Sequence, residues 1–424
     1  MNLPEDFDKH HIWHPYSPIS HPKENIEVER AQGAYIYAKD GRRFIDAISS
    51  WWVNLHGHSH PYIAEKIYEQ ALKAEHVIFA GFTHEPALKI SYRLLQLFPY
   101  LKRVFFSDNG STAVEVALKM SLQYWQLQNK PRKKIIALEG AFHGDTFGAM
   151  AVSERGIFTN VFSDLLFDVS FIPFPSKQNE EASILRLEEE LKSGEAACFI
   201  YEPLLQGAAG MRCYSPEVLD KMIALCNSYG TLCIADEIFT GFGRTGKNFA
   251  SDYLSNKPDL VCLSKGLTGG TMPMSITICS EKVEKPFLYK EGSVNLFYHG
   301  HSFTGNPLAC AAANASLDLL LEENCQKRIK NIEESHKSFL NKILPDKKIL
   351  RAESLGVMLA IELKTLEKTG YLNSIKEFLT NFFLNKGILI RPLGNVIYFL
   401  PPYNIEEQDI YYIYNAIEEL LEEI

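Results

Sequence analysis

The stretch "DLVCLSKGLTGGTMPMS", residues 259–275, places one lysine between an apolar run and a group of glycines. The run "LVCLS" predicts a buried strand, and the glycines after Lys265 allow the backbone to approach a bulky group closely. Such a lysine has three interpretations: a solvated loop residue, a residue that binds phosphate, or a residue that forms a covalent bond.

Composition limits the class of protein and of partner. The 424 residues are 46% hydrophobic and 22% charged, so we expect a large core and more than one domain. The net charge of -9 and the lack of a Lys/Arg-rich run argue against nucleic acid or a membrane surface as partner. Because no apolar leader or membrane-length apolar run occurs, we expect a cytoplasmic protein that binds small molecules. The eight cysteines form no Cys-x-x-Cys pair, so neither disulfides nor a metal site is expected.

Short apolar runs alternate with amphipathic segments from about residue 100 to 280, which predicts an α/β unit with a mainly parallel sheet. The expected strands are 103–107, 134–138, 169–173, 197–203, 231–236, 260–264 and 275–280. Amphipathic helices are expected between them, at 111–127, 181–193 and 215–229.

The last third of the chain predicts a smaller α+β unit. One long amphipathic helix is expected after residue 306, followed by strands within 356–363, 387–392 and 396–402 and helices at 374–386 and 406–423. The hairpin-like stretch "AYIYAKDGRRFID" near the start is too short to stand alone. We therefore expect residues 1–50 to join the small unit, 51–310 to form the large unit, and 311–424 to form the small one.

Two further stretches of the large unit end a strand with reactive or charged residues, at the edge where open α/β sheets bind ligands. In "FFSDNGSTAVEVALKM" a strand leads into a helix, whose first N–H groups form an anion cradle or a plain N-cap. In "CIADEIFTGFGRTG" a buried run ends in Asp236, which requires a cation or an ion pair with a nearby arginine.

The glycines of "GFGRTG", residues 241–246, match the dinucleotide-binding pattern only by letter. That fingerprint needs a strand turning directly into the glycines and a helix opening from them, whereas "DEIFT" intervenes here. Lys265 is no P-loop lysine, because its glycines follow it instead of preceding it.

Pyridoxal phosphate fits the three stretches together. It needs a lysine amine for its aldehyde, an anion cradle for its phosphate, and a carboxylate that keeps its ring nitrogen protonated. Lys265 would bond to the aldehyde, Gly110 and Ser111 would hold the phosphate, and Asp236 would pair with the ring nitrogen. That nitrogen is then the cation which the buried carboxylate requires.

The chain resembles the class III pyridoxal-phosphate aminotransferases of fold type I nearly from end to end. The general motifs are "IADEIFTGFGRTG", "LSKGLTGG" and "TGNPLACAAANASL". More specific are "HIWHPYSP", "SSWWVNLHGHSHP", "NGSTAVEVALKMSLQYW", "FHGDTFGAM" and "IRPLGNVIYFLPPY", which fit a 4-aminobutyrate or ornithine transaminase poorly. The resemblance implies a large domain with a seven-stranded sheet and a smaller α+β domain.

The resemblance also implies the site residues. Those expected at the cofactor are Gly110, Ser111, Phe142, Asp236, Ile238, Lys265, His301 and Ser302. Those expected at the substrate are Tyr16, Trp51, Trp52, Phe142, Asp145, Gly300, Arg391 and Tyr398. Other interpretations stay open: the tryptophans as core aromatics, and Arg391 and Arg244 as structural ion pairs.

Two positions depart from the family pattern. Phe142 stands where the family has a tyrosine, so the ring face is kept and a hydroxyl is lost. His301 and Ser302 stand where Pro-Thr is usual, and in the family the phosphate donor at this place comes from the neighbouring subunit. Glu202, at the end of a predicted strand, is a further polar candidate.

The implied activity is ping-pong amino transfer within a homodimer that shares its active sites. The specific motifs imply S-adenosylmethionine as donor and 8-amino-7-oxononanoate as acceptor, in biotin biosynthesis. Lysine as donor and another ω-amino acid transaminase are the alternatives. A protein that keeps the fold only as a regulator or scaffold would lose Lys265, which is present.

Overall fold

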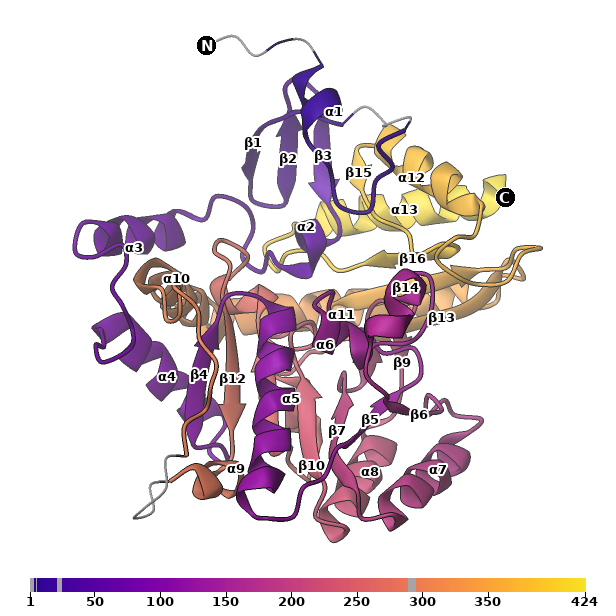
Figure 1. Cartoon of the computed structure of the whole chain (residues 1–424). Helices are drawn as coiled ribbons and strands as arrows, with labels where there is room; N and C mark the ends of the chain where they lie inside the picture. The colour runs from indigo at the N-terminus through magenta and orange to yellow at the C-terminus, as the bar shows by residue number, and fades with distance from the viewer. Residues whose placement is uncertain (1–3, 5, 21–24, 289–294) are drawn as a thin grey trace.

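The computed structural model describes residues 4, 6–20, 25–288 and 295–424 (Figure 1). The large unit is built on a seven-stranded sheet in the order β4-β12-β11-β10-β7-β5-β6. Of these seven strands β12 alone runs in the opposite direction to the other six, so the predicted mainly parallel sheet is confirmed. The strands are β4 (Arg103–Ser107), β5 (Lys134–Leu138), β6 (Ser170–Ile172), β7 (Ala196–Tyr201), β10 (Leu232–Asp236), β11 (Leu260–Leu263) and β12 (Ser275–Cys279).

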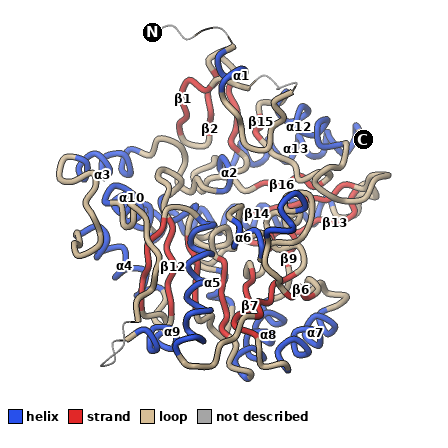
Figure 2. The backbone as a smooth tube through the Cα atoms, in the orientation of Figure 1, coloured by secondary structure: helices blue, strands red, loops and turns tan. Residues whose placement is uncertain are grey.

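Helices bury both faces of this sheet, which explains why its strands read as continuous apolar runs. Successive residues of β10 alternate between two cores: Ile234 faces the core that includes α5, and Ala235 faces the core that includes α8 and α4. Figure 2 shows these helices flanking the strands in the lower half of the molecule. The helices of the large unit are α2 (Ser49–Trp52), α3 (Pro61–Ala71), α4 (Glu85–Leu97), α5 (Gly110–Leu127), α6 (Phe147–Ala151), α7 (Glu180–Lys192), α8 (Pro216–Ser228), α9 (Glu281–Glu284) and α10 (Pro307–Leu321).

Two smaller sheets lie above the large one in Figure 1. Strands β13 (Ile349–Leu355), β14 (Met358–Leu363) and β16 (Val396–Phe399) form an antiparallel sheet with α11 (Glu323–Ile343) against it. The other sheet joins the N-terminal β1 (Val28–Gln32), β2 (Tyr35–Ala38) and β3 (Arg43–Asp46) to the C-terminal β15 (Ile388–Leu389), which pairs with β3 in parallel. The remaining elements are α1 (Phe7–His11), α12 (Ile375–Asn385), α13 (Glu407–Glu423), and the short pair β8 (Leu205–Gln206) and β9 (Arg212–Cys213). Within the described residues, 3-10 helices lie at Asn160–Leu165, Ala250–Tyr253, Lys265–Thr268 and Lys285–Phe287. The boundaries at residues 50 and 310 stay predictions.

The structure corrects two expectations about the last third of the chain. The single long helix after residue 306 is two helices, because Glu322 adopts an extended conformation with ψ 138° between α10 and α11. The break lets the mostly apolar α10 lie buried while the amphipathic α11 keeps a solvent face. Strand β13 was not expected from the sequence, because its charged residues are only half-buried and give no apolar run. In the described part of the chain, no helix is long and apolar enough to span a bilayer.

The turn between β13 and β14 fixes the small unit against the large one. Gly356 has a φ of 56°, and a Cβ at this position would lie 2.2 Å from the backbone nitrogen of Gly246. The next residue, Val357, donates its N–H to the carbonyl oxygen of Arg244 at 3.1 Å. This contact leaves no room for a side chain.

We expect Gly356→Ala to destabilise the protein more than Gly194→Ala, as measured by urea unfolding. Gly194 has a φ of 70° and open space around its Cβ position. Its alanine variant therefore bears only the cost of a side chain in the left-handed conformation, about 1 to 2 kcal/mol. Overpacking against Gly246 adds about 1 to 3 kcal/mol in Gly356→Ala. Equal losses in the two variants would contradict a role for this contact in joining the units.

Candidate active site

Three parallel strands deliver the residues singled out from the sequence to one edge of the large sheet. Asp236 is the last residue of β10, Lys265 follows β11 by two residues, and Gly110 opens α5 just after β4. They meet at a cavity of about 180 Å³. Its walls comprise Trp52, Asn109, Gly110, Ser111, Phe142, His143, Gly144, Glu202, Asp236, Ile238, Phe239 and Lys265.

The amine of Lys265 is poised as a nucleophile. Its Nζ lies 4.6 Å from the ring centroid of Trp52 and 5.5 Å from that of Phe239, and it makes no hydrogen bond to the described residues. Burial lowers the pKa of Lys265 to about 8, although the carboxylates of Asp236 and Glu202 oppose this shift. A larger share of the amine is therefore neutral near pH 7 than for a surface lysine. The backbone of Lys265 is held in the left-handed region, with φ 45°.

Asp236 is only 4% exposed and is supported from behind by a histidine. Its Oδ2 lies 2.7 Å from Nδ1 of His143, and its Oδ1 accepts the N–H of Ile238 at 3.1 Å. Nε2 of His143 is buried without a partner among the described residues. Sequence reasoning assigned His143 no role; its position in "FHGD", beside a residue expected at the cofactor, was the available signal.

The N-terminus of α5 offers two backbone donors. Asn109 and Thr112 cap each other reciprocally, whereas the N–H groups of Gly110 and Ser111 have no acceptor among the described residues. A Cβ at Gly110 would lie 3.0 Å from the side chain of Ile238, so only glycine leaves this approach open. Free N–H groups at the start of an 18-residue helix form an anion site.

Glu202 lies 4% exposed beneath the same cavity and holds two backbone segments. Its Oε2 accepts the N–H of Phe142 at 3.1 Å, and its Oε1 accepts that of Gly207 at 3.0 Å. Burial raises the pKa of Glu202 to about 7. The carboxyl thus fixes the backbone under the ring of Phe142.

An aromatic cluster with one arginine lies beside the cavity. The hydroxyl of Tyr16 donates to Oδ2 of Asp145 at 2.5 Å, and its ring lies 5.7 Å from that of Trp51. The guanidinium of Arg391 lies 4.1 Å above the ring of Trp51. Phe158, which the sequence did not single out, has its ring 5.8 Å from that of Tyr16. A nonpolar wall with a cation therefore adjoins the cavity.

The two consecutive tryptophans separate in the structure. Trp51 is 38% exposed, whereas Trp52 is buried and donates its indole N–H to the hydroxyl of Tyr398 at 3.0 Å. Tyr398 is itself 1% exposed, so it supports Trp52 from behind. Arg244 forms no ion pair with a described carboxylate; it donates to the carbonyl oxygens of Trp52, Asn54 and Pro401 instead. Arg244 is thus a structural residue, although not through an ion pair.

Gly300, His301 and Ser302 do not line this cavity of their own chain. They lie in the irregular segment 295–306, where Lys119 donates to the carbonyl oxygen of Tyr298 at 2.8 Å. These three expected residues are therefore not brought together with Lys265 within one chain.

The cavity has the three groups that pyridoxal phosphate requires: an amine, a buried carboxylate and an anion cradle. The chain belongs to the class III aminotransferases, because the family model described as "Aminotransferase class-III" matches residues 16–421. Pyridoxal 5′-phosphate is the cofactor of this class. The cofactor and the fold expected from the sequence are thereby confirmed.

Individual relatives show which members of the family the chain is similar to. The chain is 47% identical to an adenosylmethionine-8-amino-7-oxononanoate aminotransferase of Synechococcus elongatus, with 98% of this chain and 99% of the relative covered. A relative of the same name from Helicobacter pylori is 36% identical over 100% of this chain and 99% of its own length. The crystal structure of the enzyme of that name from Methanocaldococcus jannaschii superposes with a TM-score of 0.93 at 35% identity, covering 99% and 98% of the two chains.

The raised pKa of Glu202 predicts a pH dependence of stability. Between pH 4.5 and about 7 the folded state keeps a proton that the unfolded state loses, so this carboxyl makes stability fall as pH rises through that window. We expect Glu202→Gln to reduce this fall in the free energy of unfolding with rising pH, as measured by urea unfolding of the cofactor-free protein at several pH values. Glu195→Gln, at an exposed glutamate, is the control. If the free energy of unfolding fell with pH equally in the wild type and in Glu202→Gln, the shifted pKa would be contradicted.

Proposed function

We propose that this protein transfers the amino group of S-adenosylmethionine to 8-amino-7-oxononanoate, giving 7,8-diaminononanoate in biotin biosynthesis. The names of its full-length relatives support this reaction. The observation that carries it in the molecule is Arg391 stacked on Trp51 beside the cofactor cavity. This arrangement binds a carboxylate at one end of a long apolar substrate.

The side chains around the cavity divide the work of amino transfer. Pyridoxal phosphate supplies an aldehyde that carries the amino group and a ring that accepts electrons. Released from the aldehyde when the amine of the donor takes its place, Lys265 would remove the α-proton of the donor and later return a proton as an acid. Asp236, held by His143, would keep the proton on the ring nitrogen of the cofactor. The N–H groups of Gly110 and Ser111 would bind the phosphate, and the ring of Phe142 would pack against the cofactor ring.

Both substrates use one pocket in turn, because the donor leaves before the keto acid enters. The rings of Tyr16 and Trp51 attract the sulfonium of S-adenosylmethionine by a cation–π interaction. The same apolar faces accommodate the alkyl chain of the keto acid, whose carboxylate binds Arg391. Lysine is the second candidate donor, since its ammonium group suits the same rings.

A donor screen tests this proposal. With 8-amino-7-oxononanoate as acceptor, we expect diaminononanoate from S-adenosylmethionine and none from ornithine or 4-aminobutyrate, as followed by mass spectrometry. Lys265→Ala should abolish this turnover, because no other amine lines the cavity among the described residues. If diaminononanoate formed with lysine alone, the proposed donor would be wrong. If it formed with no donor, the proposed reaction would be wrong.

The working unit in this proposal is a cytoplasmic homodimer with shared active sites. Large apolar side chains near segment 295–306 are exposed in the single chain, among them Phe82, Tyr298 and Phe303. A second copy would cover them. In the dimer, Gly300 would face the partner's substrate, while His301 and Ser302 would reach its phosphate.

Hybrid dimers test the shared site. We expect Lys265→Ala and Ser302→Asp each to be inactive, the second because its carboxylate repels phosphate. Random exchange of subunits should restore about a quarter of the wild-type activity, since half of the dimers carry one intact site. Size-exclusion chromatography with tagged subunits verifies the exchange. No recovery after verified exchange would contradict a shared site.

A further inference from the structure

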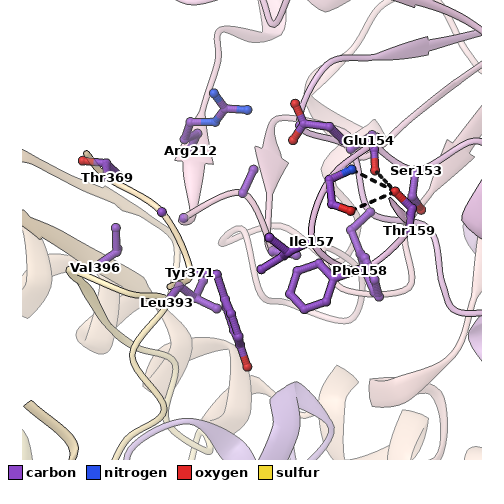
Figure 3. Close-up of a pocket in the computed structure, with 18 of the residues that line it drawn as sticks. Ser153, Glu154, Ile157, Phe158, Thr159, Arg212, Thr369, Tyr371, Leu393 and Val396 are labelled. Carbon is purple, nitrogen blue, oxygen red and sulfur yellow. Dashed lines mark hydrogen bonds between the residues drawn. The ribbon is translucent and has the colours of Figure 1, made fainter. Parts of the chain in front are cut away.

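A second and larger cavity adjoins the cofactor cavity, with Phe142 in the wall of both. Its volume is about 550 Å³. One side comes from residues 153–159 and 208–212 of the large unit, and the other from residues 369–371 and 393–396 of the small unit, as Figure 3 shows. The roles derived above for the cofactor and for the keto acid carboxylate do not use this space.

Aromatic rings connect the cavity to the substrate residues. The ring of Phe158 lies 6.4 Å from that of Phe142, 5.8 Å from that of Tyr16 and 5.0 Å from that of Tyr371. Phe158 and Tyr371 both line the cavity. A molecule bound at Tyr16 can therefore extend past Phe158 along aromatic faces, which suit a flat conjugated ring.

The charged groups of the cavity are balanced within its walls. Arg351 is satisfied by Glu353 and Glu362, at 2.6 and 2.8 Å, and donates to two backbone carbonyl oxygens. Arg212 donates to Gln206 at 2.9 Å. Arg351 therefore carries no unbalanced charge, whereas Arg212, whose side chain is hydrogen-bonded among the described residues only to a neutral amide, depends on the nearby carboxylate of Glu154 for its balance.

Glu154 differs from the other charged groups, because its carboxylate makes no hydrogen bond or ion pair with the described residues. Figure 3 shows the side chains of Glu154 and Arg212 pointing toward each other on the large-unit side of the cavity. Burial lowers the pKa of Arg212, and the carboxylate of Glu154 counteracts part of that shift. Glu154 thus balances Arg212 electrostatically while its oxygens remain available to hydroxyl donors.

We propose that this cavity binds the adenosyl group of the amino donor, with Glu154 accepting hydrogen bonds from the ribose hydroxyls and Phe158 and Tyr371 packing on the base. The inference rests on the proposed function. A nucleoside is neutral, which suits a cavity whose charges are balanced. Its flat base suits the aromatic faces, and its two adjacent hydroxyls suit the free carboxylate. The alkyl chain of the keto acid presents none of these groups and ends at Arg391.

The probe is 5′-methylthioadenosine, which carries the adenosyl group without the reacting amine. We expect it to bind the wild-type holoenzyme in calorimetry and to compete with S-adenosylmethionine. Ile157→Trp fills the cavity, because Ile157 lines it and is exposed enough to be replaced without unfolding. Glu154→Gln removes the charged acceptor at nearly constant shape. Each variant should weaken probe binding and raise the KM for S-adenosylmethionine at least about tenfold, leaving the KM for 8-amino-7-oxononanoate unchanged.

Val161→Trp is the matched control, since Val161 is 86% exposed and does not line the cavity. It should bind the probe as wild type does. If S-adenosylmethionine is a donor but the probe fails to bind, or the cavity variants affect both substrates equally, the adenosyl site is wrong while the proposed function stands. If the probe fails to bind and S-adenosylmethionine gives no product while lysine does, the proposed donor fails as well.

Discussion

The buried carboxylate of Asp236 is the constraint on which the active site depends. It ends the central strand β10 in a nonpolar sheet, where an isolated negative charge is costly. His143 and the N–H of Ile238 supply part of the required compensation, and in the function proposed above the ring nitrogen of the cofactor would supply the rest. The amine of Lys265, just after the neighbouring strand β11, is kept partly neutral by burial. The carboxylate and the lysine amine therefore lie at the same buried edge of the sheet.

The side chains of the consecutive residues Trp51 and Trp52 point to different places because of the backbone conformation between them. The φ angle of Trp52 is 67°, which turns its ring inward while Trp51 stays outside beneath Arg391. Such strain persists only where the surroundings hold it. Arg244 holds the turn through the carbonyl oxygen of Trp52, and Asp46 holds it by accepting the N–H of Ser50. A buried arginine thus positions the turn that places Trp51 beneath Arg391.

Sequence patterns located Asp236 and Lys265 because each ends an apolar run, and the carboxyl ends of parallel strands meet at one edge. The strands of the large sheet were predicted within one or two residues for the same reason: a strand buried on both faces is an uninterrupted signal. Residues 349–355 escaped notice because a half-buried strand with charged residues has no such signal. His143 and Phe158 escaped because their partners lie far away in the sequence, and only the folded chain brings them together.

The pairing of β3 with β15 has a consequence for how the chain folds as it is made. Ile45 lies opposite Ile388, so the early β3 finds its partner strand only after the whole central sheet has been synthesised. The seven strands of the central sheet lie between them in sequence and can assemble earlier. The apolar residues of β2 and β3 remain uncovered during that interval, with a sheet edge open to other chains. We expect a nascent chain that stalls before residue 388 to need chaperone protection at its N-terminal hairpin.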